Sequence, residues 1–433
     1  MGPKRKHIRV FEHQSLRVGK TFAYASGSAS AGDERHFEFT EVHLDAMVAF
    51  FEKEPTYFSL IRNGVKFNEY VGALQVGDLV ISVLPKADKA KEATKDEWQR
   101  MLLGMIRAVH GFEVKAPSSA SLNLKSNSVL DLYFELFLAE LAYLQRRGLV
   151  KQYRKTEGNQ KALKGSLQFS KQIAQNLIHK ERFYTRYTTY DAQHALHQIL
   201  YQALGVLQRI NTNTKLIGAI NSSLLNFREM PAIHATDALF DKLVFNRKTA
   251  AYQKAIDIAR LLLLHYHPNL SKGRKDVLAL MFDMNNLWEQ FILVSLRKEP
   301  NWKVRGKASA LFWKPDVGKG QKIYPDVLIK DENGINYVID TKWKLIDDKA
   351  AMQDLRQMYA YHRYFNAQKV ALLYPGDSDG VKGTFQPIPG SSPDETDSAQ
   401  CGLLFVPTSN VGISNWQMAI RAQIRTWISA NKT

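Results

Sequence analysis

Two aspartates and a lysine flank two short apolar runs in the C-terminal third of the chain. Asp326 precedes the run Val327–Ile329. Asp340 follows the run Tyr337–Ile339, and Lys342 stands two residues later. Carboxylate oxygens are ligands that Mg²⁺ prefers, and a neighbouring ammonium group can position a water molecule and offset negative charge on a phosphate. If the fold brings these three side chains together, they could hydrolyse a phosphodiester.

An antiparallel hairpin would bring the three side chains together. Both runs are rich in β-branched or aromatic residues, and the turn signal Asp331–Gly334 separates them. Alternate residues of a strand share a face, so Asp340 and Lys342 project to one side and strand pairing places Asp326 alongside them. The same short pattern also fits a turn solvated by Asp331 and an ion pair of Asp340 with Lys342 on an edge strand.

The segments on either side of the hairpin predict helices that add polar groups. Met281–Arg297 reads as a helix that presents Glu289 among large apolar residues. Met352–Phe365 carries apolar residues at helical spacing and includes Gln357. A strand is predicted at Val370–Tyr374. This order of helix, hairpin, helix and strand resembles the PD-(D/E)xK nuclease core.

The composition favours a polyanionic partner. The chain has 59 Lys and Arg against 42 Asp and Glu, a formal net charge of +17, and such a surface gains affinity for nucleic acid by releasing condensed counterions. The single cysteine, Cys401, excludes an internal disulfide and a Cys-based zinc cluster, which fits a reducing compartment. No apolar run reaches the length of a membrane span. We expect a cytoplasmic protein that does not associate with membranes.

The pattern of apolar residues predicts an α+β multidomain protein. Residues 1–90 are expected to form a β-rich N-terminal domain, with a hairpin turn at Asn63-Gly64 and a buried strand at Leu79–Leu84. Residues 91–272 are expected to form a helical, basic middle region. Residues 273–433 are expected to form the α/β nuclease-like domain, which includes a loop from Asp377 to Gln400.

The most basic part of the middle region runs from Arg146 to Arg186. It holds eleven Lys and Arg and only two acidic residues, Glu157 and Glu181, with aromatic residues interleaved. A polyanion-binding surface is favoured over a solvated helical face, because the opposite charges that would neutralise an ordinary helical face are nearly absent.

Two other patterns in the chain resemble binding motifs but are incomplete. Gly19-Lys20-Thr21 ends like a phosphate-binding loop, but Gln14 stands where the first glycine is needed, so we expect no nucleotide binding by this chain itself. His194 and His197 could ligate a metal, yet no third ligand has a recognisable spacing, which favours packed helix residues.

Taken together, these features resemble the McrC family, the nuclease subunit of the McrBC modification-dependent restriction system. The resemblance covers most of the chain and is strongest from Lys164 to Pro375. The segments that carry it are Leu84-Pro85-Lys86, Lys164-Gly165-Ser166-Leu167, Asn176, Tyr190-Asp191, Pro325-Asp326, Asp340-Thr341-Lys342, Gln357 and Tyr361.

The resemblance implies a Mg²⁺-dependent endonuclease that hydrolyses DNA by in-line attack of water. Asp326, Asp340 and Lys342 fall on the catalytic positions of the family. By this resemblance the two aspartates hold the metal with the carbonyl oxygen of Thr341, and Lys342 assists the attacking water.

Two residues of the flanking helices fall on auxiliary positions of the same motif. Glu289 is expected to contact the metal or the water, and Gln357 to contact the DNA backbone. Both therefore join the predicted catalytic set.

The resemblance also implies partners. The chain would bind a hexameric AAA+ GTPase, McrB, whose activity it stimulates and whose translocation triggers cutting of double-stranded DNA. Its N-terminal half would reach into the pore of the GTPase ring, and cutting both strands would require nuclease domains to pair. Two alternatives stay open: a binding subunit that activates an NTPase while its nuclease fold only docks on DNA, and a stand-alone RecB-like or resolvase-type nuclease.

Overall fold

The computed structural model describes residues 6–24, 35–77, 79–86, 95–109, 128–211, 213–227, 229–267, 277–344, 346, 349–386, 400–408 and 412–430. The chain divides into two compact units. The first is built mainly from Val129–Leu280, and the second from Lys6–Leu74, Leu79–Ser128 and Met281–Thr433. The fold is mixed α and β, as expected. Both predicted domain boundaries, at 90/91 and 272/273, fall outside the described residues.

The first unit contains a group of packed helices. Their inward faces are lined by Leu, Ile, Val and aromatic side chains that are almost fully buried, which is what an apolar stripe at helical spacing predicts. The elements are α3 (Val129–Arg147), α5 (Ala195–Ile210), α6 (Thr214–Leu225), α7 (Asp237–Asp241), η1 (Ala250–Tyr252), α8 (Gln253–Leu264) and β12 (Tyr266–His267), which pairs with the start of β13 (Val277–Asp283).

His194 and His197, both in this unit, are packing residues, as expected. His194 is the N-cap residue of α5, and its ring is hydrogen-bonded to the carbonyl oxygen of Val150. His197 is fully buried, and its two ring nitrogens lie 2.6 Å from the carbonyl oxygen of Ala192 and 2.9 Å from the hydroxyl of Tyr252. Both nitrogens of His197 therefore have protein partners.

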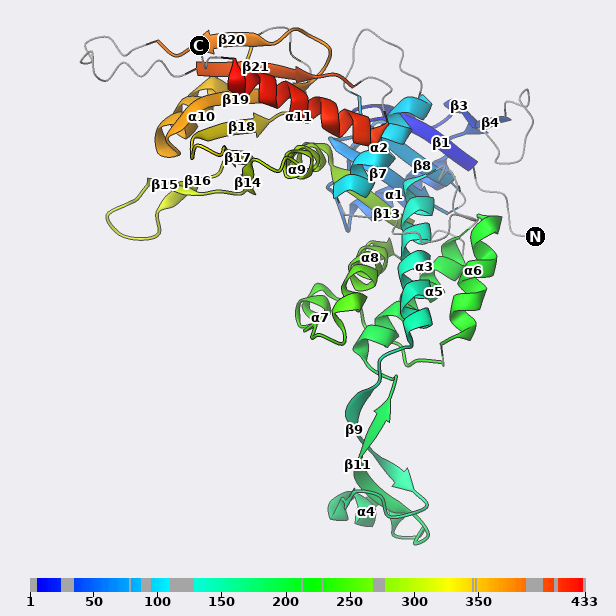
Figure 1. The fold of residues 1–433 in the computed structure, drawn as a ribbon. Coiled ribbons are helices and arrows are strands. Elements are labelled where there is room, and N and C mark those ends of the chain that lie inside the picture. Colours follow the sequence, from blue (N-terminus) through cyan, green and yellow to red (C-terminus); the bar gives the residue numbers. More distant parts are fainter. Residues whose placement is uncertain are drawn as a thin grey trace. The chain divides into compact units, whose positions relative to one another are not determined.

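The basic segment predicted as part of a helical region is mostly a long hairpin. β9 (Gln152–Gln160) and β11 (Phe183–Asp191) pair antiparallel along their whole length, and β10 (Ser166–Leu167) and α4 (Phe169–Asn176) lie at the end far from the helices (Figure 1). The strands are rich in Tyr and Thr, which favour extended backbone. They escape a search for apolar alternation because few of their side chains are buried.

The N-terminal part of the second unit contains the predicted strands. The predicted hairpin is present, with Arg62 and Asn63 in the turn, Asn63 at a φ of +54°, and Gly64 paired with Ile61 as the first residue of the second strand. A Cβ on Gly64 would lie 2.0 Å from the carbonyl oxygen of Leu16, so only glycine fits there. The strands are β1 (Lys6–Phe11), β2 (Ser15–Arg17), β3 (Thr21–Tyr24), β4 (Arg35–Glu38), β5 (Phe58–Ile61), β6 (Gly64–Phe67), β7 (Tyr70–Val76) and β8 (Leu79–Leu84).

One strand and two helices of this N-terminal part complete its description. β8 is buried at every position, as expected for its continuous apolar sequence, and pairs parallel with β1. The helix α1 (Glu41–Phe51) was not predicted, and it buries one face through Ala46, Met47 and Phe50. The helix α2 (Lys95–Val109) follows in the described part of the chain.

A six-stranded mixed sheet forms the C-terminal part of the second unit, in the order β14-β17-β18-β19-β21-β20. β17 and β18 are the predicted antiparallel hairpin, and β18, β19 and β21 run parallel. The strands are β14 (Lys303–Gly306), β17 (Val327–Lys330), β18 (Asn336–Thr341), β19 (Ala367–Pro375), β20 (Val381–Thr384) and β21 (Gln400–Val406). β20 lies within the segment predicted as a loop from Asp377 to Gln400, so that part of the prediction is wrong.

Helices cover both faces of this sheet. Val338 of β18 packs in the cluster that contains Met358 and Tyr361 of α10, whereas its neighbour Tyr337 meets Trp427 of α11. Because neighbouring strand residues point to opposite faces, α10 and α11 lie on opposite sides of β18. The helices are α9 (Met284–Leu296), α10 (Met352–Tyr364) and α11 (Ile413–Ser429), and the first two confirm the helices predicted on either side of the hairpin (Figure 1).

Across the described ranges, none of the helices is both long enough and apolar enough to cross a membrane.

Candidate active site

The hairpin brings Asp326 to the end of β18. Val327 pairs with Ile339, so the residues just outside this pair, Asp326 and Asp340, lie next to each other. Asp326 Oδ2 accepts hydrogen bonds from the backbone N–H of Thr341 at 2.7 Å and from the Thr341 hydroxyl at 2.8 Å. The fold thus fixes one predicted carboxylate against the strand that carries the other.

Asp340 is a buried carboxylate with a charged neighbour. Its side chain is 2% exposed, and its Oδ2 atom lies 2.7 Å from Lys342 Nζ. The two atoms form an ion pair, in which the Lys342 ammonium group donates to the Asp340 carboxylate. The backbone of Lys342 is held by a hydrogen bond to the carbonyl oxygen of Leu373 on β19.

The solvated-turn and edge-strand interpretation of this hairpin is half right. Asp331 does order the turn, because its Oδ1 atom accepts hydrogen bonds from the backbone N–H groups of Asn333 and Ile335. However, β18 has β17 on one side and β19 on the other, so Asp340 and Lys342 do not stand on an edge strand. The Asp340–Lys342 ion pair on an interior strand is therefore not explained by exposure to solvent at a sheet edge.

Three carboxylates interact electrostatically at this place. Burial, and secondly the charge of Asp326, raise the pKa of Asp340 to about 6, although Lys342 opposes the shift. Burial, and then Asp326, raise the pKa of Glu289 on α9 to about 7, with Asp340 adding to the effect and Lys307 opposing it. A site that concentrates negative charge in this way favours the binding of a cation.

Lys342 remains a cation in this setting. Burial acts to lower its pKa, but the carboxylates of Asp340, Asp354 and Asp326 together raise it above the usual value. Lys342 therefore keeps its proton at neutral pH and can supply positive charge and hydrogen-bond donors.

Gln357 is ordered by a chain of contacts that ends beside Asp326. Its Nε2 atom donates to the Tyr361 hydroxyl at 2.8 Å, and that hydroxyl donates to the carbonyl oxygen of Tyr324 at 2.7 Å. The Oε1 atom of Gln357 lies 3.5 Å from Lys342 Nζ. Of the predicted residues, Glu289 is the least tightly connected to the others: its Oε1 atom accepts a hydrogen bond from its sequence neighbour Gln290 at 3.2 Å.

A residue that the sequence analysis missed supports the strand end. Glu12, which is 6% exposed, accepts hydrogen bonds from Trp343 Nε1 at 2.9 Å and from the backbone N–H of Lys86 at 2.8 Å. The ring of Trp343 also meets that of Trp288, the neighbour of Glu289, edge to face at 5.3 Å. Glu12 and Trp343 are 331 residues apart, so no local pattern could have revealed the contact.

The donor set fits a Mg²⁺ ion that keeps several water ligands. Over the part of the chain that the structure describes, no three His, Cys, Asp or Glu side chains are grouped closely enough to hold a metal by themselves. Asp326 and buried Asp340 supply two adjacent carboxylates, and burial together with the charge of Asp326 raises the pKa of Asp340. Mg²⁺ is commonly held by one or two carboxylates with water completing the shell, so Asp326, Asp340 and the Thr341 carbonyl suffice.

Comparisons with known proteins identify the family of the chain. The family model for the McrBC 5-methylcytosine restriction system component matches residues 65–375. The structure of a half-complex of Thermococcus gammatolerans McrB AAA+ hexamers with bound McrC contains a similar chain, with a TM-score of 0.63 and 19% identity over 97% of this chain and 100% of that one. At this identity the likeness shows the fold.

A second structure, of the Thermococcus gammatolerans McrBC complex, aligns with a TM-score of 0.44 and 18% identity over 67% of this chain and 87% of that one. A search among curated proteins finds no match. The family match spans most of the chain and includes the hairpin and both flanking helices. The chain therefore belongs to the family of McrBC 5-methylcytosine restriction system components.

Proposed function

We propose that this chain is the endonuclease subunit of a modification-dependent restriction complex and that it cuts double-stranded DNA with Mg²⁺. The observation that carries the proposal is the meeting of Asp326, Asp340 and Lys342 at the end of one buried hairpin. The order of α9, the hairpin, α10 and β19 agrees with a PD-(D/E)xK core. The net charge of +17 supports a nucleic-acid substrate.

Asp326, Asp340 and the Thr341 carbonyl would hold the metal, and bound Mg²⁺ would polarise the scissile phosphate. Lys342, kept charged by its acidic neighbours, would orient the attacking water and stabilise negative charge on the phosphate. Glu289, whose pKa is raised to about 7, is suited to accept a proton from that water near neutral pH. Gln357, fixed by Tyr361, would contact the DNA backbone.

We propose further that the chain binds and stimulates a hexameric AAA+ GTPase. Support comes from the structure that contains the similar Thermococcus chain, a half-complex of McrB AAA+ hexamers with bound McrC. Within the first unit, the end of the β9–β11 hairpin exposes apolar side chains, among them Phe169 and Ile178. Exposed apolar side chains gathered at one end of a hairpin are suited to a protein partner.

The proposal is tested with the full chain, its GTPase partner, GTP, Mg²⁺ and methylated duplex DNA. Lys342→Ala should lower the single-turnover rate of cutting by about 10³-fold or more, because a charged group that acts in the transition state is lost. Stimulation of the GTPase should stay at the wild-type level.

Two other outcomes would each favour an alternative. Undiminished cutting by Lys342→Ala would leave the chain as an NTPase-activating subunit whose nuclease fold only docks on DNA. Efficient cutting without the partner would favour a stand-alone nuclease of the RecB-like or resolvase type.

A further inference from the structure

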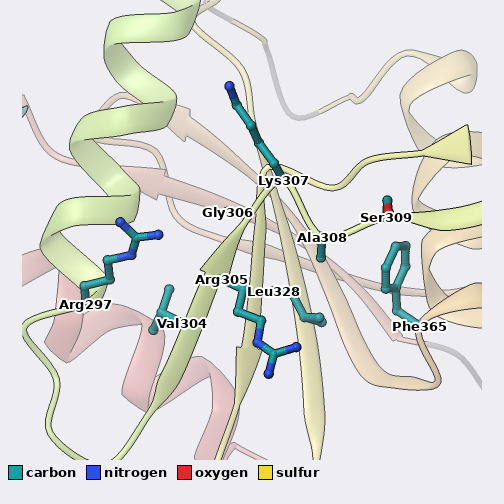
Figure 2. Close-up of a pocket in the computed structure, with 9 residues that line it drawn as sticks. All are labelled: Arg297, Val304, Arg305, Gly306, Lys307, Ala308, Ser309, Leu328 and Phe365. Carbon is teal, nitrogen blue, oxygen red and sulfur yellow. The ribbon is translucent and has the colours of Figure 1, made fainter. Parts of the chain in front are cut away.

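A basic groove lies beside the candidate active site. It has a volume of about 460 Å³ and follows β14 and the turn after it (Figure 2). Its lining includes Arg297, Arg305, Lys307 and Ser309, with Phe365 on the side opposite Arg297, and no acidic side chain is among the lining residues. A concave surface that holds only positive charge attracts anions.

Among the described residues, the three cations of this groove lack the close ion pairs that other cations of the same unit form. None of Arg297, Arg305 and Lys307 forms an ion pair with any residue that the structure describes. Other cations of the same unit are paired: Arg425 lies 2.8 Å from Glu299, and Lys344 lies 2.6 Å from Asp354. The groove therefore presents positive charge that is available to a ligand.

One side of the groove adjoins the backbone of Asp326 and Val327. Gly306 pairs with Val327, the residue after Asp326, and a Cβ on Gly306 would lie 3.6 Å from the Asp326 carbonyl oxygen. Lys307, at the start of the turn, is near enough to Glu289 to lower its pKa against the larger effect of burial. A strand of DNA with its scissile phosphate at Asp326 would continue along this surface.

A second, independent feature extends the same surface. The ribbon formed by β15 (Ala310–Trp313) and β16 (Gln321–Ile323) exposes a set of large apolar side chains: Leu311, Phe312, Trp313, Val317 and Tyr324. The same ribbon and its turn carry one acidic residue, Asp316, and three lysines: Lys314, Lys319 and Lys322. Exposed apolar patches of this kind mark binding surfaces, and aromatic residues among basic ones suit nucleic acid.

We propose that the basic groove and the β15–β16 ribbon bind the backbone of duplex DNA next to the scissile phosphate. The assignment rests on the proposed nuclease function. DNA is favoured over an acidic protein surface because β14, which carries Arg305, pairs with β17 directly after Asp326. A two-stranded ribbon also has a size that the major groove between the two DNA backbones admits.

The first test measures how DNA binding depends on salt. The full chain is titrated with an unlabelled DNA duplex of about 30 base pairs, and EDTA is present so that no cutting occurs. The double variant Arg297→Gln/Arg305→Gln should reduce the magnitude of the slope of the logarithm of the DNA association constant against the logarithm of salt concentration by about 2. Each lost phosphate contact lowers that magnitude by about 0.9. Between 50 and 200 mM salt the variant should lose about tenfold less affinity than the wild type.

A matched control removes the same charge from the same unit. Lys53→Gln/Lys66→Gln neutralises two exposed lysines near β5 and β6 and should leave the slope unchanged. An equal slope for the wild type and the groove variant would overturn the proposal, as would equal slope reductions in both double variants.

The second test uses the fluorescence of Trp313. All seven tryptophans lie in the described part of the chain, and Trp313 alone is exposed, at 54%. DNA should therefore change the emission of the wild type, and Trp313→Phe should lose most of that change while remaining folded. A DNA-induced change that persists in Trp313→Phe would contradict a contact with the ribbon.

The two tests separate this proposal from the nuclease assignment. If the chain never cuts DNA but the groove variant shows the reduced slope, the nuclease function fails and the groove stands. If the chain cuts and the slope is unaffected, the groove alone fails. If the groove variant loses binding of the GTPase partner and keeps its DNA slope, the surface serves a protein and the proposal is wrong.

Discussion

The buried carboxylate of Asp340 has a like charge, Asp326, and an opposite charge, Lys342, beside it. Its raised pKa means that the folded protein holds this proton more tightly than the unfolded chain does. Stability without metal should therefore fall as pH rises from about 4 through about 6. Asp340→Asn removes this cost, so it should unfold at a higher temperature than the wild type at pH 8 in EDTA, with a gain of about 1–3 kcal/mol.

The gain from Asp340→Asn should disappear at pH 4, where the wild-type carboxyl is protonated in the fold. Asp45→Asn, which changes an exposed aspartate of α1, is the control and should leave the melting temperature unchanged at both pH values. A lower melting temperature for Asp340→Asn at pH 8 would show that the ion pair with Lys342 outweighs burial and the repulsion from Asp326.

Protons and Mg²⁺ should compete for the same carboxylates. With a pKa of about 6 for Asp340 and about 7 for Glu289, lowering the pH from 8 to 6 protonates a metal-holding carboxylate in part and its neighbour Glu289 largely, and so removes negative charge that attracts the cation. The Mg²⁺ concentration for half-maximal cutting should rise by about tenfold or more over this range. Glu289→Gln should weaken the dependence, whereas Glu332→Gln, in the exposed turn of the hairpin, should not. A half-maximal concentration that is constant with pH would contradict this account.

At the scale of elements, a tyrosine fixes α10 to the segment before Asp326. Removing the Tyr361 hydroxyl leaves the Tyr324 carbonyl and Gln357 without their partner. Tyr361→Phe should cost about 1 kcal/mol of stability. It should lower the rate of cutting by about tenfold, because small misplacements of a positioned group are costly. Tyr359→Phe on the same helix is the control, and equal rates for the two variants would remove the positioning role.

The end of β18 depends on Glu12 as well. Glu12→Leu would leave Trp343 Nε1 and the Lys86 N–H buried without an acceptor, at a cost of about 2–5 kcal/mol in the free energy of unfolding. Glu12→Gln can still accept both bonds and should restore stability and cutting. Glu38→Leu on β4 is the exposed control. If Glu12→Gln is as unstable as Glu12→Leu, the charge and not the acceptor is what matters.

Elements differ in how far the sequence predicts them. The catalytic hairpin, α9 and α10 were predictable because buried strands and amphipathic helices leave a periodic apolar pattern. The β9–β11 hairpin was not, since its mostly exposed strands leave no such pattern. Strand β20 escaped for the same reason, because all its residues are exposed.

At the scale of the whole molecule, the sequence predicted the family and the mixed α/β fold, and it predicted which residues meet at the hairpin. It could not show the support from Glu12, because that contact joins residues 331 positions apart in the chain. Nor could it show that Arg297, Arg305 and Lys307 line one groove, since only the pairing of β14 with β17 places them beside Asp326. Contacts of this kind depend on topology and not on local pattern.

The most direct test of the central claim compares two aspartates of one hairpin. Asp340→Asn and Asp331→Asn each remove one negative charge, the first at the candidate metal site and the second in the turn. In the complex with the GTPase partner, GTP and Mg²⁺, Asp340→Asn should cut methylated duplex DNA about 10³-fold or more slowly, with GTPase stimulation retained, and Asp331→Asn should cut at close to the wild-type rate. Cutting by Asp340→Asn at the rate of Asp331→Asn would contradict the account.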